Sequence, residues 1–249
     1  MTIATHQEQI LENERRWKQK PLLRLLYGDF HRLIAGHLSR RPGGAIVELG
    51  SGIGNIREVI PDCIRTDLFP NPWIDQVENA YALSFGDGTV SDLILFDVFH
   101  HLRYPGAALH EFSRVLMPGG RVIIFDPCIS LLGWLVYGLF HPEPVAYFQP
   151  IEWLPPAGWS PSEMDYYAAQ GNATRVFAGK GSEDELRDWH LRAVIRSAAI
   201  SYVASGGYSR RQLYPLSALP LMKRIDSLCD RLPALFATRM LAVLEKPSP

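Results

Sequence analysis

The sequence contains few cysteines, no long hydrophobic run and no excess of one charge sign. Its 249 residues carry 25 Lys and Arg against 26 Asp and Glu, and this balance argues against wholesale binding of nucleic acid. The three cysteines, Cys63, Cys128 and Cys229, form no CxxC pair, so neither a disulfide scaffold nor a zinc ribbon is indicated. We therefore expect a reducing, cytoplasmic environment.

The longest apolar run, residues 129–140 (ISLLGWLVYGLF), is too short to cross a bilayer, which needs about 20 residues. The N-terminal segment is polar and has no apolar stretch typical of a signal peptide. Residues 129–140 thus have three interpretations: a lid, a buried core helix, or an interfacial segment in weak contact with a membrane surface. Basic residues outnumber acidic ones in residues 1–42 and 186–249, which fits the third interpretation or an anionic substrate.

Short apolar runs alternate with helical patterns from residue 45 onward. This alternation predicts a doubly wound, mainly parallel α/β sheet, because parallel strands need helical crossovers between them. Strands are expected at residues 45–49, 63–67, 92–96 and 121–125, with two final strands at 193–205 and 238–244. Helices are expected at residues 7–38, 54–60 and 105–116.

A glycine-rich segment, ELGSGIGN at residues 48–55, follows the first strand. Glycines at 50, 52 and 54 allow a ligand to approach the backbone closely, and the loop amides would face that ligand. The dinucleotide-binding fingerprint GxGxxG would need Gly or Ala where Asn55 stands, so the spacing disfavours a nicotinamide cofactor.

Four ordered blocks follow one another here: ELGSGIG, an acidic strand end at Asp67, the segment NAYALSFGDGTVSDLILFDVFHHL, and HEFSRVLMPGGRVIIFDP. In these blocks residues 45–127 resemble class I S-adenosylmethionine-dependent methyltransferases of the type 11 subgroup. The resemblance implies a Rossmann-like, mainly parallel seven-stranded sheet. It also implies an enzyme that transfers a methyl group from S-adenosylmethionine by in-line displacement, with S-adenosylhomocysteine as the product.

The resemblance also implies a set of cofactor-binding residues. The glycine loop would wrap the methionine and ribose parts, Asp67 would accept hydrogen bonds from the ribose hydroxyls, and residues 97–98 would lie beneath the sulfonium. Two positions depart from the family pattern: Asn79 stands where Asp is common, and Ser84 where Pro is usual. The complete set is Glu48, Gly50, Ser51, Gly52, Gly54, Asp67, Leu68, Asn79, Ala80, Asp97 and Val98.

Three side chains near the strand ends are candidates for a general base, which an acceptor hydroxyl would require. His101 is the first choice, because it lies a few residues beyond a strand end. His100 is expected to point into the interface between sheet and helix, and Asp126 lies at the carboxyl end of its own strand. We expect no metal.

The chain is expected to divide into an N-terminal helical cap (1–42), a cofactor-binding core (43–127), an aromatic-rich insertion or lid (128–185) and a C-terminal part that completes the sheet (186–249). The acceptor is expected to be a small molecule, apolar, lipid-linked or anionic, rather than a nucleic acid. Two other functions remain open: a non-catalytic binding protein on the same fold, and a nicotinamide oxidoreductase.

Overall fold

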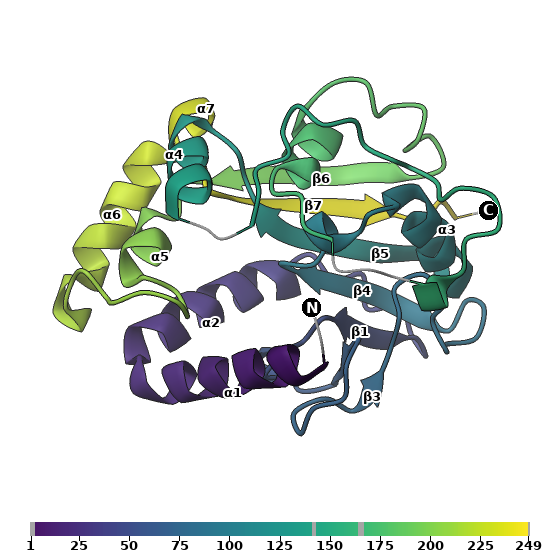
Figure 1. The fold of residues 1–249 in the computed structure, drawn as a ribbon, viewed down its shortest axis with the longest axis horizontal. Coiled ribbons are helices and arrows are strands. Elements are labelled where there is room, and N and C mark those ends of the chain that lie inside the picture. Colours follow the sequence, from purple (N-terminus) through teal and green to yellow (C-terminus); the bar gives the residue numbers. More distant parts are fainter. Residues whose placement is uncertain (1–2, 141–142, 164–166, 249) are drawn as a thin grey trace.

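A seven-stranded sheet forms the centre of the computed structural model, which describes residues 3–140, 143–163 and 167–248 (Figure 1). Its strand order is β3-β2-β1-β4-β5-β7-β6. Neighbouring strands run parallel except β7, which is antiparallel to both β5 and β6. The strands are β1 (Ala45–Leu49), β2 (Cys63–Asp67), β3 (Gln76–Val77), β4 (Val90–Phe96), β5 (Leu116–Pro127), β6 (His190–Ser197) and β7 (Arg239–Glu245). The predicted mainly parallel, doubly wound seven-stranded sheet is confirmed.

Helices cover both faces of this sheet. They are α1 (Ile3–Gln19), α2 (Pro21–Ala35), α3 (Pro105–Val115), α4 (Leu131–Phe140), α5 (Ile200–Ser205), α6 (Leu219–Cys229) and α7 (Pro233–Phe236). Proline stands in the first turn of α2 and α3, where its missing N–H is not needed. Short helical turns occur at η1 (Asn55–Glu58), η2 (Phe99–His101), η3 (Pro161–Glu163), η4 (Thr174–Ala178) and η5 (Leu216–Ala218).

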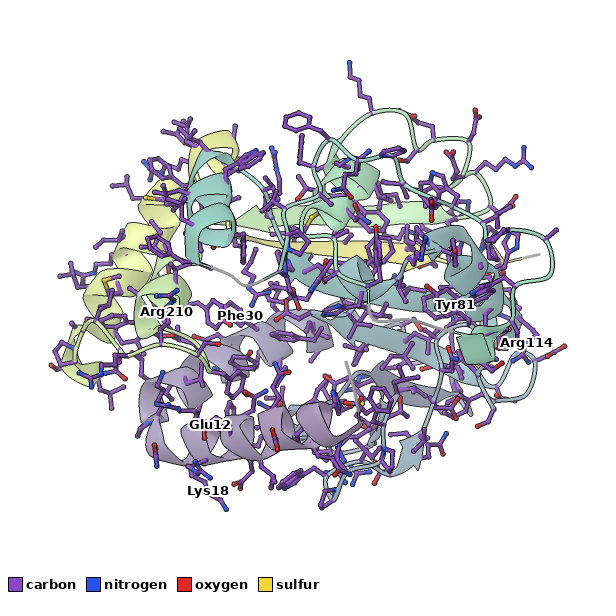
Figure 2. All side chains as sticks on the ribbon, viewed as in Figure 1. Glu12, Lys18, Phe30, Tyr81, Arg114 and Arg210 are labelled. Carbon is purple, nitrogen blue, oxygen red and sulfur yellow. The ribbon has the colours of Figure 1, made fainter. Side chains whose placement is uncertain are left out.

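Successive side chains of a strand point to opposite faces of the sheet. Because helices cover both faces, the side chains of the central strands are buried on either side. In β4, Leu93 and Leu95 pack in the same cluster as Phe112 of α3. The alternate side chains of β4 pack in the cluster that contains α1 and α2. On that face Phe30 of α2 lies against Phe125 of β5, with ring centres 4.8 Å apart (Figure 2).

Two sequence expectations for local structure are wrong in part. The strand expected at 193–205 ends at Ser197, and residues 200–205 form helix α5 instead. Ala199, with φ of +47°, turns the chain out of the extended conformation. The carboxylate of Asp226 then holds the start of α5 by accepting hydrogen bonds from both the N–H and the hydroxyl of Ser201. The helix expected at 54–60 is only the short turn η1.

Helix α4 occupies most of the apolar run 129–140, but it is not a core helix. Only Gly133 and Tyr137 of α4 are buried, whereas Leu131 and Leu139 are 69% and 68% exposed. The core-helix interpretation is therefore wrong. Across residues 3–140, 143–163 and 167–248, every helix is too short or too polar to cross a membrane.

Phe112 allows a direct test of the packing of α3 on the sheet. We expect Phe112→Ala to lower the free energy of unfolding by about 3–5 kcal/mol, because removal of this fully buried ring leaves a cavity. Phe148→Ala is the matched control, since Phe148 is 83% exposed and should cost less than about 0.5 kcal/mol. Urea unfolding of both variants measures this, and equal losses would contradict the packing described.

Candidate functional site

The glycine loop leaves β1 through backbone conformations that favour glycine. Gly50, Gly52 and Gly54 have φ of +69°, +54° and +66°. A Cβ atom on Gly50 would lie 2.5 Å from Cγ2 of Val98, at the carboxyl end of β4. A Cβ atom on Gly54 would lie 2.6 Å from the carbonyl oxygen of Trp73. The loop therefore packs tightly against the segments that follow its two neighbouring strands.

Hydrogen bonds fasten this loop to β2. The N–H of Ser51 donates to the carbonyl of Thr66 over 2.8 Å, and the hydroxyl of Thr66 donates back to the carbonyl of Glu48 over 2.9 Å. The N–H of Gly52 donates to Oδ2 of Asp67 over 3.1 Å. Asp67 is buried and stands at the end of β2, as the sequence predicts. The loop and the carboxylate therefore form one connected unit.

Glu48 is a buried carboxyl group directly before the loop. Its Oε2 atom has no hydrogen-bond partner among the described residues. Burial raises the pKa of Glu48 to about 7, and the nearby Asp67 carboxylate adds to the rise. Such a group gains a large stabilisation of its charged form when a cation is placed beside it.

Helix α1 covers the loop from the other side. Nε2 of His6 lies 3.4 Å from Oδ1 of Asp67. Ile10 packs on the loop, because a Cβ atom on Gly52 would lie 3.5 Å from Cδ1 of Ile10. The His6 ring also lies against Phe69, 5.0 Å between ring centres, next to the half-exposed Leu68. Sequence analysis did not identify His6, because a histidine in a polar helix carries no signal of its partner.

Asn79 uses both ends of its amide within the protein. Its Nδ2 donates to the carbonyl of Pro161 over 3.1 Å, and its Oδ1 accepts the N–H of Tyr81 over 3.0 Å. Beside it, Tyr81 meets Trp159 edge to face at 5.2 Å between ring centres (Figure 2). The amide of Asn79 thus anchors the insertion. An Asp at this position would lose the donor to Pro161, so this departure from the family pattern has a structural role.

Asp97 forms an ion pair that the sequence did not indicate. Its two carboxylate oxygens meet the two terminal nitrogens of Arg239, the first residue of β7. Arg239 is buried, and its guanidinium lies 4.7 Å from the ring centre of Tyr202. Asp97 itself has φ of +58°, which directs the chain sharply away from β4. Asp97 and Val98 therefore both lie at the edge of the sheet that carries the glycine loop.

His100, His101 and Asp126 lie together. Glu143 joins them, although the sequence did not indicate it. Nδ1 of His100 lies 3.0 Å from Oδ1 of Asp126, and its Nε2 lies 3.3 Å from Oε2 of Glu143. Nε2 of His101 lies 3.6 Å from Oε1 of Glu143, and its Nδ1 lies 2.8 Å from the carbonyl of Tyr167. Glu143 belongs to the irregular insertion, where no periodic pattern marks it.

The two histidines have opposite pKa shifts. Burial lowers the pKa of His100, but the carboxylates of Asp126 and Glu143 outweigh burial and raise it to about 10. Burial and the neighbouring His100 lower the pKa of His101. His100 is buried, whereas the side chain of His101 is 32% exposed.

The part of the chain that carries much of this site matches a known protein family. Residues 47–124 match the family model described as a methyltransferase domain. This segment of the chain is therefore a methyltransferase domain. The matched segment includes the glycine loop, Asp67, Asn79 and both histidines. No curated protein matches the sequence.

Solved structures of two methyltransferases have the same fold. One is a geranyl diphosphate methyltransferase in complex with S-adenosylmethionine, with 12% identity and a TM-score of 0.53, over 88% of this chain and 85% of the other. Another is the geranyl diphosphate C-methyltransferase of Streptomyces coelicolor A3(2) in complex with Mg²⁺, geranyl diphosphate and S-adenosylhomocysteine. It has 11% identity and a TM-score of 0.53, over 88% of this methyltransferase chain and 78% of the other.

The residues of this methyltransferase fit its cofactor in two respects. The buried Oε2 of Glu48 lacks a partner among the described residues and is suited to an ammonium group. Asp67 offers two carboxylate oxygens at the end of the adjacent strand, which suits neighbouring hydroxyls.

The raised pKa of Glu48 predicts a pH-dependent effect on stability. The folded protein holds a proton on Glu48 up to pH 7, whereas the unfolded chain releases it near pH 4.5. Stability therefore falls as the pH rises through this window, by about 3 kcal/mol in total. Glu48→Gln abolishes this contribution, so it should gain stability relative to the wild type between pH 5 and pH 8. Urea unfolding at several pH values measures the difference, and a difference that does not change with pH would contradict the buried, uncharged Glu48.

Proposed function

We propose that this methyltransferase transfers a methyl group from S-adenosylmethionine to a small-molecule acceptor of apolar or lipid-linked character. The observation that carries the proposal is the unpartnered Oε2 of the buried Glu48 beside a glycine loop that is hydrogen-bonded to Asp67. When bound, S-adenosylmethionine supplies the methyl group on a sulfonium. The three free thiols agree with a reducing cytoplasm.

Each cofactor-binding residue has a proposed role. Glu48 would hold the amino group, and Gly50, Ser51, Gly52 and Gly54 would bind the methionine and ribose parts. Asp67 would accept the ribose hydroxyls, which requires His6 to give way or to bind the same ribose. Leu68, Asn79 and Ala80 would face the adenine, with Asp97 and Val98 beneath the sulfonium.

The protein's contribution to the reaction would be to hold the acceptor close and in line, and to exclude water. The Asp97–Arg239 pair supports this role, because it fixes the end of β4 with two hydrogen bonds to a buried guanidinium. An acceptor hydroxyl would lose its proton near the histidine cluster. His101 is the partly exposed member, whereas Asp126 orients the buried His100.

The face formed by α4, α6 and α7 supports an apolar or lipid-linked acceptor. These helices gather at the end of the sheet to which the β6 arrow points, which is the carboxyl end of the parallel strands (Figure 1). The exposed apolar side chains of these helices and of the residues between α6 and α7 are Leu131, Trp134, Leu135, Leu139, Phe140, Leu221, Leu228, Leu232 and Leu235. A patch of this kind is typical of an interaction surface rather than of ordinary solvent-exposed surface.

Cations border the same face. Lys223, Arg224 and Arg231 of the α6 region line a shallow depression together with Leu228. Arg210 donates to the carbonyl of Phe140 over 2.9 Å, and its guanidinium lies 5.3 Å from the Phe140 ring centre (Figure 2). Apolar side chains bordered by basic ones are suited to an anionic membrane surface. A weak membrane contact would place this methyltransferase next to a lipid-linked acceptor.

The similar structures agree with an apolar acceptor. The enzyme of Streptomyces coelicolor A3(2) was solved with geranyl diphosphate, a molecule with an apolar chain and an anionic group. The present chain offers both an apolar face and buried or bordering cations, so an acceptor of similar chemistry fits.

The cofactor role of Asp67 can be tested by calorimetry. We expect Asp67→Asn to weaken S-adenosylmethionine binding about 10–100-fold, because one of the two acceptors for the ribose hydroxyls is lost in a closed site. Asp62→Asn is the control, since Asp62 is exposed and lies outside the site. Unchanged affinity of a folded Asp67→Asn variant would remove Asp67 from the cofactor site. Titration with NAD tests the oxidoreductase alternative, and we expect no binding.

The membrane contact can be tested by flotation with vesicles that contain anionic lipid. We expect the wild-type protein to float with these vesicles at low salt, and to float less with neutral vesicles or at high salt. Replacing Leu135 and Leu139 by Asp should abolish flotation. Leu11→Asp is the control, because Leu11 is equally exposed but lies on α1. Flotation that the α4 variant retains would contradict a contact through this face.

A further inference from the structure

His100, His101 and Glu143 converge in a geometry that suits a metal ion. One ligand atom from each of the three lies within 4.8 Å of the others. The Nε2 atoms of His100 and His101 lie 3.3 and 3.6 Å from the two carboxylate oxygens of Glu143. In a tetrahedral site with bonds of about 2.0–2.2 Å, neighbouring ligand atoms are about 3.3–3.6 Å apart. Both nitrogen–oxygen distances fall within this range.

Hydrogen bonds with neighbouring residues orient all three side chains. Nδ1 of His101 must donate to the carbonyl of Tyr167, because a carbonyl oxygen only accepts. Nδ1 of His100 meets the buried carboxylate of Asp126 in the same way. With these contacts made, both Nε2 atoms lie beside the carboxylate of Glu143. The side-chain amide of Gln170 donates to Oε2 of Glu143 over 2.6 Å. Carboxylate or carbonyl partners on the far ring nitrogen are typical of metal-binding histidines.

We propose that His100, His101 and Glu143 bind one divalent transition-metal ion, such as Zn²⁺, through the two Nε2 atoms and the carboxylate. Two imidazoles and one carboxylate suit Zn²⁺ better than Mg²⁺, which prefers oxygen ligands. Three protein ligands leave a coordination position open. Asp126 is the positioning residue that fixes His100.

This site adds to the proposed function without depending on it. The site follows β4 through η2, so it lies next to Val98 in the chain. Its role in catalysis rests on the proposed function: the open position would hold a hydroxyl oxygen of the acceptor, and the ion would lower the pKa of that hydroxyl so that its proton passes to water. Metal binding itself is measured separately from methyl transfer.

The test uses the full chain, free of any tag and treated with a chelator, in titrations with Zn²⁺ and with Co²⁺. We expect one Zn²⁺ per chain, and a Co²⁺ absorption spectrum with nitrogen and oxygen ligands and no thiolate band. Asp126→Asn should weaken Zn²⁺ binding about 10–100-fold. Glu143→Gln and His101→Gln should weaken it at least as much. His110→Ala is the control, because His110 is exposed on α3, and its affinity should equal that of the wild type.

Several results would overturn the site. These are a wild-type protein that binds no Zn²⁺, folded Glu143→Gln and His101→Gln variants that bind as tightly as the wild type, or a cobalt–thiolate band. Circular dichroism shows whether each variant is folded, and three variants at separate ligands keep the test decisive if one of them fails to fold. Asp67→Asn should keep its metal affinity while losing cofactor affinity, so a failure of the metal site is distinguishable from a failure of the proposed function.

Discussion

The candidate site depends on the way the chain leaves β1. Gly50 turns with a positive φ so closely against Val98 that any side chain at residue 50 would collide with it. This contact joins the loop after β1 to the end of β4, and the Gly52–Asp67 hydrogen bond joins the same loop to the end of β2. Three parallel strands thereby present their carboxyl ends at one edge, where open α/β sheets bind their ligands.

Ionisable groups that are buried or partly buried are concentrated at this edge of the sheet. Glu48, the Asp97–Arg239 pair and the Asp126–His100–Glu143 cluster lie at or just beyond the ends of β1, β4, β5 and β7. Charge that is buried without full compensation costs stability, and such groups are typical of functional sites. Each of the three has a different degree of compensation. Arg239 neutralises Asp97, and His100 lies between the carboxylates of Asp126 and Glu143. Oε2 of Glu48 has no hydrogen-bond partner among the described residues.

The sequence predicted what local patterns determine. The buried strand β1 appears as an uninterrupted apolar run, and the glycine spacing located the loop that follows it. The acidic residue expected at the end of the second strand, Asp67, stands at the end of β2. Partners that come from distant segments were not predictable. Arg239 stands 142 residues from Asp97, and Glu143 belongs to an insertion without periodicity. Helix α5 was read as strand because its start depends on Asp226, a side chain from another helix.

The most direct test is calorimetry of S-adenosylmethionine binding in two buffers that differ in ionisation enthalpy, at pH 6. Glu48 is mostly protonated at this pH, because its pKa is about 7. Binding of the cofactor's ammonium group against Glu48 predicts the release of about one proton in the wild type and none in Glu48→Gln. Equal proton release in both proteins, or no binding to the wild type, would contradict a cofactor site built on Glu48 and the glycine loop.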